Sequence, residues 1–331
     1  MIDPVTEDFK WGILGTGGIA RAFAKDLSYL QGHRVAAVGS RTSASAAEFA
    51  SEFPGATGYG SYEELVAADV DAVYVATPHT FHAENSLLAL NAGKPVLCEK
   101  PFTINAKEAR AVIDRAHELK LPLLEAIWTR FLPHIQQVRE ILKSGVLGDI
   151  HTVIADHGQF LPEEIAPRLW RPELGGGALL DLGIYPITLA HLVLGAPQSF
   201  TVSATLTDEK VDNQISMIFD YPQGAQALLS ATMLNRTAIS GVISGSKARL
   251  EMDGFFFVPT TMRLISRDGQ VQTFPNNYKG HGLREEAVEF ARMVRANELE
   301  SPLAPHAMSL EIMELMDAIR EKIGVTYPSE R

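Results

Sequence analysis

The 331-residue sequence has a single cysteine, Cys98, and no uncharged apolar run of about 18 residues. One cysteine cannot form an intramolecular disulfide, so we expect a reducing compartment, the cytoplasm. Without a long apolar run, no segment is expected to span a membrane. The first residues also lack a basic region followed by an apolar core, which predicts no secretory signal.

Excess positive charge is also missing. Lys and Arg number 29 against 40 Asp and Glu, so the net charge is −11. Because nucleic acids and anionic membranes are bound through basic surface, this balance argues against both as partners and favours a small-molecule partner. No His or Cys cluster has the spacing of metal ligands, so we expect no bound metal.

The sequence does contain enough apolar material for a substantial core, at 46% hydrophobic residues. Its length predicts two domains on a usual size of about 150 residues each. Up to residue 127, apolar strands alternate with helical segments, which is typical of a parallel, doubly wound sheet. From His151 onward, strand-like runs follow one another, and helices at about 283–296 and 308–322 close the chain.

These patterns predict an α/β protein of two parts. Residues 1–127 would form a Rossmann domain with a doubly wound parallel sheet. Residues 128–331 would form an α+β domain with a large, mostly antiparallel open sheet, and the last helix could pack back on the Rossmann domain.

A glycine-rich turn follows the first apolar strand, with the spacing G-x-G-x-x-A that ends at Ala20. Gly15 permits the tight turn, and Gly17 lets the backbone approach a pyrophosphate. The N-terminus of the following helix then offers N–H groups to the phosphates. We expect the cofactor to contact Gly15, Thr16, Gly17, Gly18 and Ile19.

The second apolar strand ends without an acidic residue, in Gly39-Ser40-Arg41-Thr42. NAD-binding proteins usually carry Asp or Glu here, and a carboxylate would repel a 2′-phosphate. Arg41 can pair with that phosphate through its planar guanidinium, while Ser40 and Thr42 can donate hydroxyls. The sequence therefore predicts a preference for NADP(H), with NAD(H) as the open alternative.

Two later strands also end in polar residues. Thr77, Pro78 and His79 follow one of them, and Glu99 and Lys100 close the other. Ligands bind at the carboxyl ends of the strands in doubly wound sheets, so we expect all five residues beside the cofactor. For His79 and Glu99 a purely structural role stands as the alternative.

A segment of another kind interrupts the strand-rich second half. Three glycines, residues 175–177, precede an apolar run, and residues 178–194 predict a buried helix. Asp181 and Tyr185 are four positions apart and would share one face of that helix. A carboxylate and a phenol on an otherwise apolar face need a reason: either they form a functional pair, or each makes a structural hydrogen bond, Tyr185 to backbone and Asp181 to a loop.

These motifs together resemble the glucose–fructose oxidoreductase / inositol dehydrogenase (Gfo/Idh/MocA) family over essentially the whole chain. They are the G-x-G-x-x-A turn, Glu99-Lys100-Pro101, and the Gly-Gly-Gly-x-x-x-Asp-x-x-x-Tyr segment. Residues 125–131, 177–185 and 323–328 are similar to the dimeric dihydrodiol dehydrogenase / NADP-linked D-xylose dehydrogenase branch. The resemblance implies hydride transfer between nicotinamide and a carbon bearing a hydroxyl or carbonyl. It also implies a homodimer or homotetramer formed through the C-terminal sheet.

Alcohol oxidation needs a base for the hydroxyl proton. Many family members carry His four residues after the helix Asp, whereas this chain has Tyr185, which favours Tyr185 as the proton-transfer group. A phenol with an ordinary pKa near ~10 is a weak base, but an ammonium such as that of Lys100 would favour phenolate. Lys100 could also move the proton itself. Asp181 would bond substrate hydroxyls or orient Lys100.

The predicted function is an NADP-dependent oxidoreductase acting on CH–OH groups of a small neutral sugar, polyol or cyclic diol. One alternative is a relative that cleaves glycosides with a recycled NAD. Another is a non-catalytic NAD(P)-binding regulator, although such proteins usually lose the lysine or proton-transfer residue that Lys100 and Tyr185 supply here. We expect the substrate pocket to include Trp128, Arg130, Phe160 and Tyr278.

Overall fold

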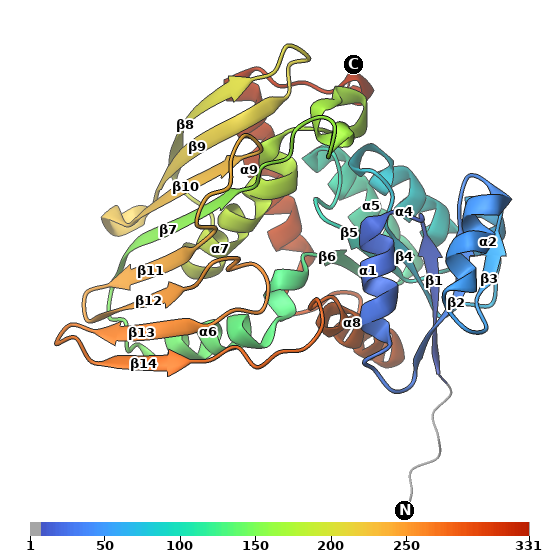
Figure 1. Cartoon of the computed structure of the whole chain (residues 1–331), viewed down its shortest axis with the longest axis horizontal. Helices are drawn as coiled ribbons and strands as arrows, with labels where there is room; N and C mark the ends of the chain where they lie inside the picture. The colour runs from blue at the N-terminus through green and yellow to red at the C-terminus, as the bar shows by residue number, and fades with distance from the viewer. Residues whose placement is uncertain (1–7, 331) are drawn as a thin grey trace, which may run out of the picture. The chain divides into compact units, whose positions relative to one another are not determined.

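The computed structural model describes residues 8–330, which form two compact units (Figure 1). Unit 1 runs through Phe131 and also contains Lys279–Leu310. Unit 2 consists of Leu132–Tyr278 and the chain from Glu311 onward. The expectation of no secretory signal concerns mainly the first seven residues, which lie outside the described range.

Helix α8 (Arg284–Ala296) belongs to unit 1, although the sequence assigns this region to the second domain. The reason is a polar cap supplied by α1 (Gly18–Leu27). The carboxylate of the buried Asp26 accepts the backbone N–H groups of Gly282 and Leu283 at 2.7 and 2.8 Å. These bonds satisfy amides at the start of α8, a position where a carboxylate is favoured.

Unit 1 is built on a six-stranded sheet in the order β3-β2-β1-β4-β5-β6, and every pairing is parallel. The predicted doubly wound sheet is therefore confirmed. The order reverses between β1 and β4, which is the switch point where such sheets bind ligands. The strands are β1 (Phe9–Leu14), β2 (His33–Gly39), β3 (Thr57–Tyr59), β4 (Ala72–Val75), β5 (Val96–Glu99) and β6 (Leu123–Ala126).

The helices of unit 1 begin where the sequence supplies capping residues. Thr42, Ser61 and Asn105 each accept the backbone N–H three residues further on. Glu64 lies three residues after Ser61, the spacing of a capping box, but its carboxylate accepts the N–H of Gly60 rather than that of Ser61. The remaining elements are α2 (Ser43–Ser51), α3 (Tyr62–Val66), η1 (His79–Phe81), α4 (His82–Asn91), α5 (Ala106–Leu119) and η2 (Trp128–Phe131).

Unit 2 contains an eight-stranded sheet in the order β14-β13-β12-β11-β7-β10-β9-β8. Only β7 and β10 pair in parallel, so the predicted mostly antiparallel sheet is confirmed. The sequence misses β14, whose four residues include two polar side chains. The strands are β7 (Ile150–Gly158), β8 (Ser199–Leu206), β9 (Asp212–Asp220), β10 (Gln226–Thr232), β11 (Gly241–Gly245), β12 (Ala248–Met252), β13 (Met262–Ser266) and β14 (Val271–Phe274).

Helix α7 (Ile184–Leu194) is the core helix of unit 2 and packs against β7, β10 and β11. The segment Pro172–Leu194 is apolar and long enough to cross a membrane by composition, but 78% of its apolar window is buried in the fold. The other elements are α6 (Pro133–Ser144), η3 (Pro167–Trp170), η4 (Pro172–Leu174), η5 (Leu179–Gly183), η6 (Pro222–Gly224), η7 (Pro328–Glu330) and α9 (His306–Ile323), which begins in unit 1 and ends in unit 2.

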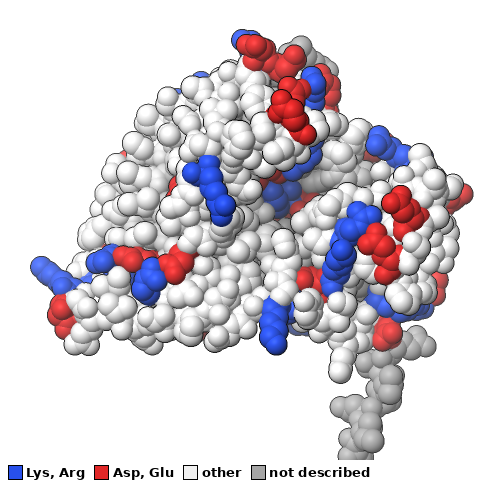
Figure 2. Space-filling view, viewed as in Figure 1, with Lys and Arg blue, Asp and Glu red and all other residues white. Residues whose placement is uncertain are grey.

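The sheet of unit 2 buries one face and exposes the other. Ile215, Met217 and Phe219 of β9 are at most 1% exposed, whereas the residues that alternate with them face outward. Figure 2 shows few charged side chains over β8–β10, while charges gather over β12–β14. Over β8–β10, the outward face therefore combines hydroxyl and aliphatic side chains with little charge.

Candidate active site

The glycine turn of unit 1 leaves space where a cofactor would approach. Gly15 has φ +111°, and a Cβ there would lie 2.6 Å from the carbonyl oxygen of Ala76, so only glycine fits. Gly17 is the N-cap of α1, and a Cβ on Gly17 or Gly18 would meet no atom within 4 Å. Thr16 and Ile19 are half-buried on the same turn. The open space at the helix N-terminus fits a pyrophosphate.

The end of β2 presents one exposed cation, Arg41. Ser40 is buried, and its backbone N–H donates to Tyr59. Burial raises the pKa of the nearby Tyr62 hydroxyl, and the charge of Arg41 opposes that rise. The hydroxyl of Thr42 is engaged in capping α2, since it bonds to both the N–H and the hydroxyl of Ser45. Arg41 is thus the residue at this strand end best placed to meet a phosphate.

His82, which the sequence analysis overlooks, joins two loops at the strand ends. Its Nε2 lies 2.8 Å from the carbonyl oxygen of Thr77, and its Nδ1 lies 2.8 Å from that of Pro101. The buried ring of His79 packs edge-on against it, with centroids 5.7 Å apart. Pro78 caps the short helix η1 beside them. The signal in the sequence for this contact is a second histidine, three positions after His79, at the start of α4.

The turn that carries Lys100 is held by buried carboxylates. Glu99 is 4% exposed and accepts both the hydroxyl of Tyr74 and, at 3.1 Å, the backbone N–H of Lys100. Glu125 accepts the N–H of Phe102 at 3.0 Å, just after the cis Lys100–Pro101 peptide. Lys100 itself is half-buried. The backbone on both sides of Lys100 is therefore fixed by side-chain hydrogen bonds.

Two further acidic groups lie near this turn: Glu125, at the carboxyl end of a strand, and Glu286, which the sequence did not single out. Burial raises the pKa of Glu125, and the hydroxyl of Ser309 counteracts this by donating to its carboxylate at 2.6 Å. Burial, reinforced by the charges of Glu99, Asp26 and Glu125, raises the pKa of Glu286 on α8 well above its usual value. Neither carboxyl oxygen of Glu286 has a hydrogen-bond partner within residues 8–330. Burial without a hydrogen-bond partner thus disfavours the charged form of Glu286.

In unit 2, Asp181 lies on a π-helical turn, η5, which leads into α7. The predicted buried helix at 178–194 is thus present, but its first part is a π-helical turn, wound more widely than an α-helix. Asp181 is 8% exposed and accepts from the Arg168 guanidinium at 2.8 Å. Arg168 was not among the expected site residues. Its charge offsets that of Asp181.

Tyr185 is buried in an aromatic cluster of unit 2. Its ring centroid lies 4.5 Å from that of Phe257 and 5.2 Å from that of His157. His157 is 1% exposed, and its Nε2 lies 2.8 Å from the side-chain amide nitrogen of Gln159. His157, a polar neighbour of Tyr185, was also not predicted, because β7 reads as an ordinary strand.

The four expected pocket residues have different surroundings. Trp128 and Arg130 are buried in unit 1: Trp128 stacks on His281 at 5.2 Å, and Arg130 donates to the carbonyl of Leu303. In unit 2, Phe160 is 62% exposed. Tyr278 lines a cavity of about 360 Å³ together with Pro133, His134, Gln137, Pro259, Thr260, Met262, Phe274, Pro275, Asn276 and Asn277.

The predicted residues are thus divided between the units. The glycine turn, the β2 end, His79, Glu99 and Lys100 belong to unit 1, whereas Asp181 and Tyr185 belong to unit 2. Among the residues that the structure describes, no group of three or more His, Cys, Asp or Glu side chains is arranged to hold a metal ion.

Solved structures of known enzymes have the same fold. KijD10, a 3-ketoreductase from Actinomadura kijaniata solved with NADP and TDP-benzene, is 30% identical, and the match covers 95% of this chain and 98% of that chain with a TM-score of 0.84. Variants of KijD10 in which a tyrosine is replaced by phenylalanine, or a lysine by alanine or glutamate, have also been solved.

Sequence relatives cover nearly the whole chain. D-xylose 1-dehydrogenase (NADP(+)) from Hypocrea jecorina is 36% identical over 96% of this chain and 93% of its own. Trans-1,2-dihydrobenzene-1,2-diol dehydrogenase from Xenopus laevis is 35% identical over 96% of this chain and 99% of its own. Residues 9–126 match the oxidoreductase family with an NAD-binding Rossmann fold, and residues 135–251 match the GFO/IDH/MocA C-terminal domain. The chain therefore belongs to the GFO/IDH/MocA family of oxidoreductases.

Proposed function

We propose that this protein is an NADP-dependent dehydrogenase or reductase acting on a CH–OH or carbonyl carbon of a small neutral sugar, polyol or cyclic diol. The observation that carries this proposal is the open glycine turn at Gly17 and Gly18, next to a strand end that carries Arg41 and no acid. The relatives that act on D-xylose and on a dihydrodiol support the substrate class.

The residues of unit 1 fit NADP(H). The amides at the start of α1 would hold the pyrophosphate, and Arg41 with Ser40 would hold the 2′-phosphate. Hydride exchange with nicotinamide is the chemistry that bound NADP(H) supplies. NAD(H) is the weaker candidate, because no carboxylate follows β2 to bond a free ribose hydroxyl.

We assign proton transfer to Lys100 and Tyr185. The backbone around Lys100 is fixed by Glu99 and Glu125, which suits a lysine whose Nζ must hold one position at the substrate hydroxyl. Tyr185 is buried among aromatic rings, so its hydroxyl is shielded from bulk water. Asp181 would bond the substrate hydroxyls.

A neutral substrate is favoured by the pairing of Asp181 with Arg168. A carboxylate oxygen of Asp181 lies 2.8 Å from a guanidinium nitrogen of Arg168, and Asp181 is only 8% exposed. A pair of opposite charges leaves no net charge to recognise a carboxylate or phosphate, but it offers both acceptors and donors to hydroxyl groups.

The proposal is tested by NADP(H)-linked absorbance with D-xylose, other aldoses, inositols and a trans-dihydrodiol. Lys100→Ala and Tyr185→Phe should each lower kcat by about 10²- to 10⁴-fold while NADPH still binds. Lys107→Ala on the surface of α5 and Tyr221→Phe in unit 2 are matched controls that should retain activity.

Other outcomes would overturn parts of this function. Normal turnover in both variants would exclude the proposed proton-transfer groups. Glycoside cleavage without net change in NADPH would identify the glycoside-cleaving alternative. Cofactor binding without turnover on the whole panel would identify a non-catalytic regulator.

We further propose a homodimer formed through the bare sheet face of unit 2, with a homotetramer as the alternative. Ile154, Leu228 and Ile218 lie in register on neighbouring strands and are 46%, 41% and 42% exposed. Leu228→Glu should yield monomers in light scattering, whereas Ile165→Glu on a loop should not. A monomeric wild type would contradict the proposal.

The single buried cysteine and the acidic composition suit the cytoplasm.

A further inference from the structure

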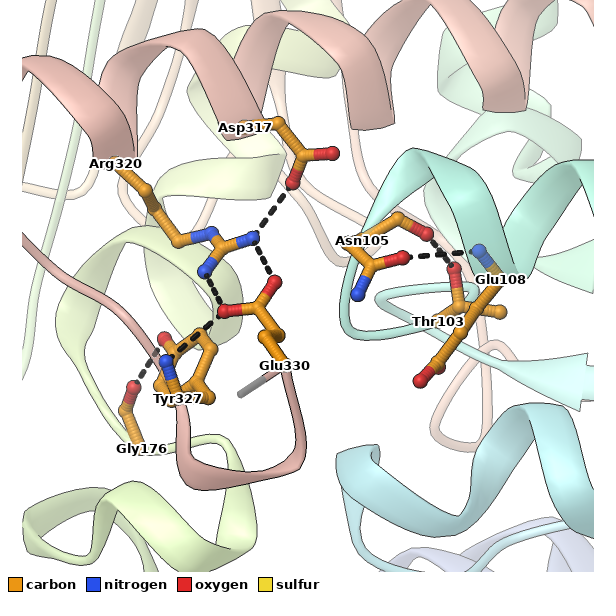
Figure 3. Close-up of polar contacts among 8 residues, drawn as sticks. All are labelled: Thr103, Asn105, Glu108, Gly176, Asp317, Arg320, Tyr327 and Glu330. Carbon is orange, nitrogen blue, oxygen red and sulfur yellow. Dashed lines mark hydrogen bonds and ion pairs between the residues drawn. The ribbon is translucent and has the colours of Figure 1, made fainter.

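The last residues of the chain form a closed arrangement within unit 2 (Figure 3). The guanidinium of Arg320 donates to both carboxylate oxygens of Glu330 at 2.8 Å and to Asp317 at 2.7 Å. The same guanidinium lies 4.8 Å from the centroid of the Tyr327 ring. Glu330 also accepts the backbone N–H of Tyr327 at 2.9 Å. The ring of Tyr327 is thereby held in one orientation.

Tyr327 uses its hydroxyl to bond the three-glycine turn. The hydroxyl donates to the carbonyl oxygen of Gly176 at 2.7 Å, across 151 positions of sequence (Figure 3). Tyr327 is fully buried, and burial together with the charge of Asp212 raises the pKa of its hydroxyl well above the usual value. The phenol therefore keeps its proton and acts as a donor at every physiological pH.

The three-glycine turn is also hydrogen-bonded to the segment that carries Arg168. The N–H of Gly176 donates to the carbonyl of Arg171 at 3.1 Å, and that of Gly177 donates to Leu169 at 2.8 Å. A Cβ on Gly176 would lie 2.5 Å from the carbonyl oxygen of Leu169, so the two segments are in close contact. A shift of the turn must therefore move Arg168 as well.

The other end of the turn leads directly to Asp181. The buried carboxylate of Asp212 accepts the N–H of Leu179, the first residue of η5, at 2.7 Å. Asp181 lies two residues further along η5 and pairs with Arg168 at 2.8 Å. The turn is therefore connected to both residues of the Asp181–Arg168 pair, by hydrogen bonds to the segment of Arg168 and by the chain that leads into Asp181.

We propose that Tyr327 is a positioning residue that fixes the Asp181–Arg168 pair for substrate binding through its hydrogen bond to Gly176. The inference rests on the proposed function, in which Asp181 bonds the substrate. Tyr327 touches neither partner of the pair in the contacts described above; it acts through the backbone of the turn. The C-terminal residues around Tyr327 thus contribute to substrate affinity by positioning this pair.

Tyr327→Phe removes the donor and keeps the ring beneath Arg320. We expect KM for the substrate to rise about 5- to 10-fold, as for the loss of one buried hydrogen bond, while kcat and the Kd for NADPH change little. Amide hydrogen exchange should also accelerate at residues 176–183, with or without substrate. The matched control is Tyr221→Phe, a buried tyrosine of unit 2 whose hydroxyl has no partner among the described residues.

A double-mutant cycle separates positioning from a merely structural role. If Tyr327 acts through the pair, Tyr327→Phe should raise KM less in an Arg168→Ala background than in the wild type. Multiplicative effects on KM, or unchanged KM and exchange in Tyr327→Phe, would overturn the inference. Failure of the proposed function has a different signature, namely no turnover by the wild type, and the exchange measurement then still decides whether Tyr327 holds the turn.

Discussion

The two glycine turns of this protein have opposite environments. In unit 1, a Cβ on Gly17 or Gly18 would meet nothing within 4 Å. In unit 2, a Cβ on Gly177 would lie 2.3 Å from the carboxylate of Asp212, and one on Gly176 would lie 2.5 Å from the carbonyl of Leu169. Glycine is present in the first turn to leave room for a ligand, and in the second to let the chain pack against itself.

The comparison shows that a run of glycines has no single meaning. The open turn exposes amides at a helix N-terminus, so its value lies in binding. The closed turn is hydrogen-bonded to η3 and to Tyr327, and Asp212 bonds the backbone just after it. These bonds hold the backbone of the residues that follow in one position. Substitution should therefore affect ligand affinity at one turn and stability at the other.

The largest effect is expected at Gly177. Gly177→Ala places a methyl group against Asp212 at a backbone φ of +112°, and should lower the free energy of unfolding by about 2–4 kcal/mol. Gly17→Ala, the matched change, should cost at most about 1 kcal/mol of stability, because Gly17 is the N-cap of α1, but should weaken NADPH binding about 10-fold or more, because the methyl group occupies the approach of the pyrophosphate. Urea unfolding and fluorescence titration measure the two quantities. Equal stability loss in both variants would remove the distinction between the turns.

A second prediction concerns cofactor choice beside the open turn. Arg41→Ala should weaken NADPH binding about 10- to 100-fold, the usual effect of losing a charge-assisted hydrogen bond, and should leave NADH binding nearly unchanged. Titration with both cofactors tests this. An equal loss for both would mean that Arg41 does not hold the 2′-phosphate.

Per pH unit, the smallest effect is a pH dependence of stability at the closed turn. Burial raises the pKa of Asp212 from its ordinary 3.8 to about 7, although the amide of Leu179 and the charge of Arg320 oppose the rise. Between these values the folded state binds more protons than the unfolded state, so the contribution of Asp212 to stability falls as pH rises through this window.

Asp212→Asn should lack this slope. The difference in unfolding free energy between wild type and variant should change by at most about 1.4 kcal/mol per pH unit between pH 4 and 7. Urea unfolding of both proteins at several pH values measures it. Parallel pH profiles would show that Asp212 does not titrate in this range.

Local patterns made much of unit 1 predictable. The turn at Gly15 and the caps at Thr42 and Ser61 depend on residues within four positions of one another, and the structure has each of them. The same reasoning misses α6 and β14. Nor do local patterns link α8 to α1, because the amides that Asp26 caps are more than 250 positions away.

The environment of the candidate site could not be read in the same way. His82 bonds to Pro101 across 19 positions, and Glu125 bonds to Ser309 across 184. Glu286 lies on a helix with an ordinary sequence pattern, and only its burial near other carboxyl groups raises its pKa. Such contacts carry no periodic signal in the sequence.

The sequence by itself determined the dinucleotide turn, the two kinds of sheet and the identity of Lys100, Asp181 and Tyr185 as candidates. It could do so because backbone geometry and hydrophobic periodicity are properties of neighbouring residues. The tertiary structure alone decided that Arg168 neutralises Asp181 and that Tyr327 braces the closed turn. Charge pairing and burial depend on which distant residues meet, and only the folded chain brings them together.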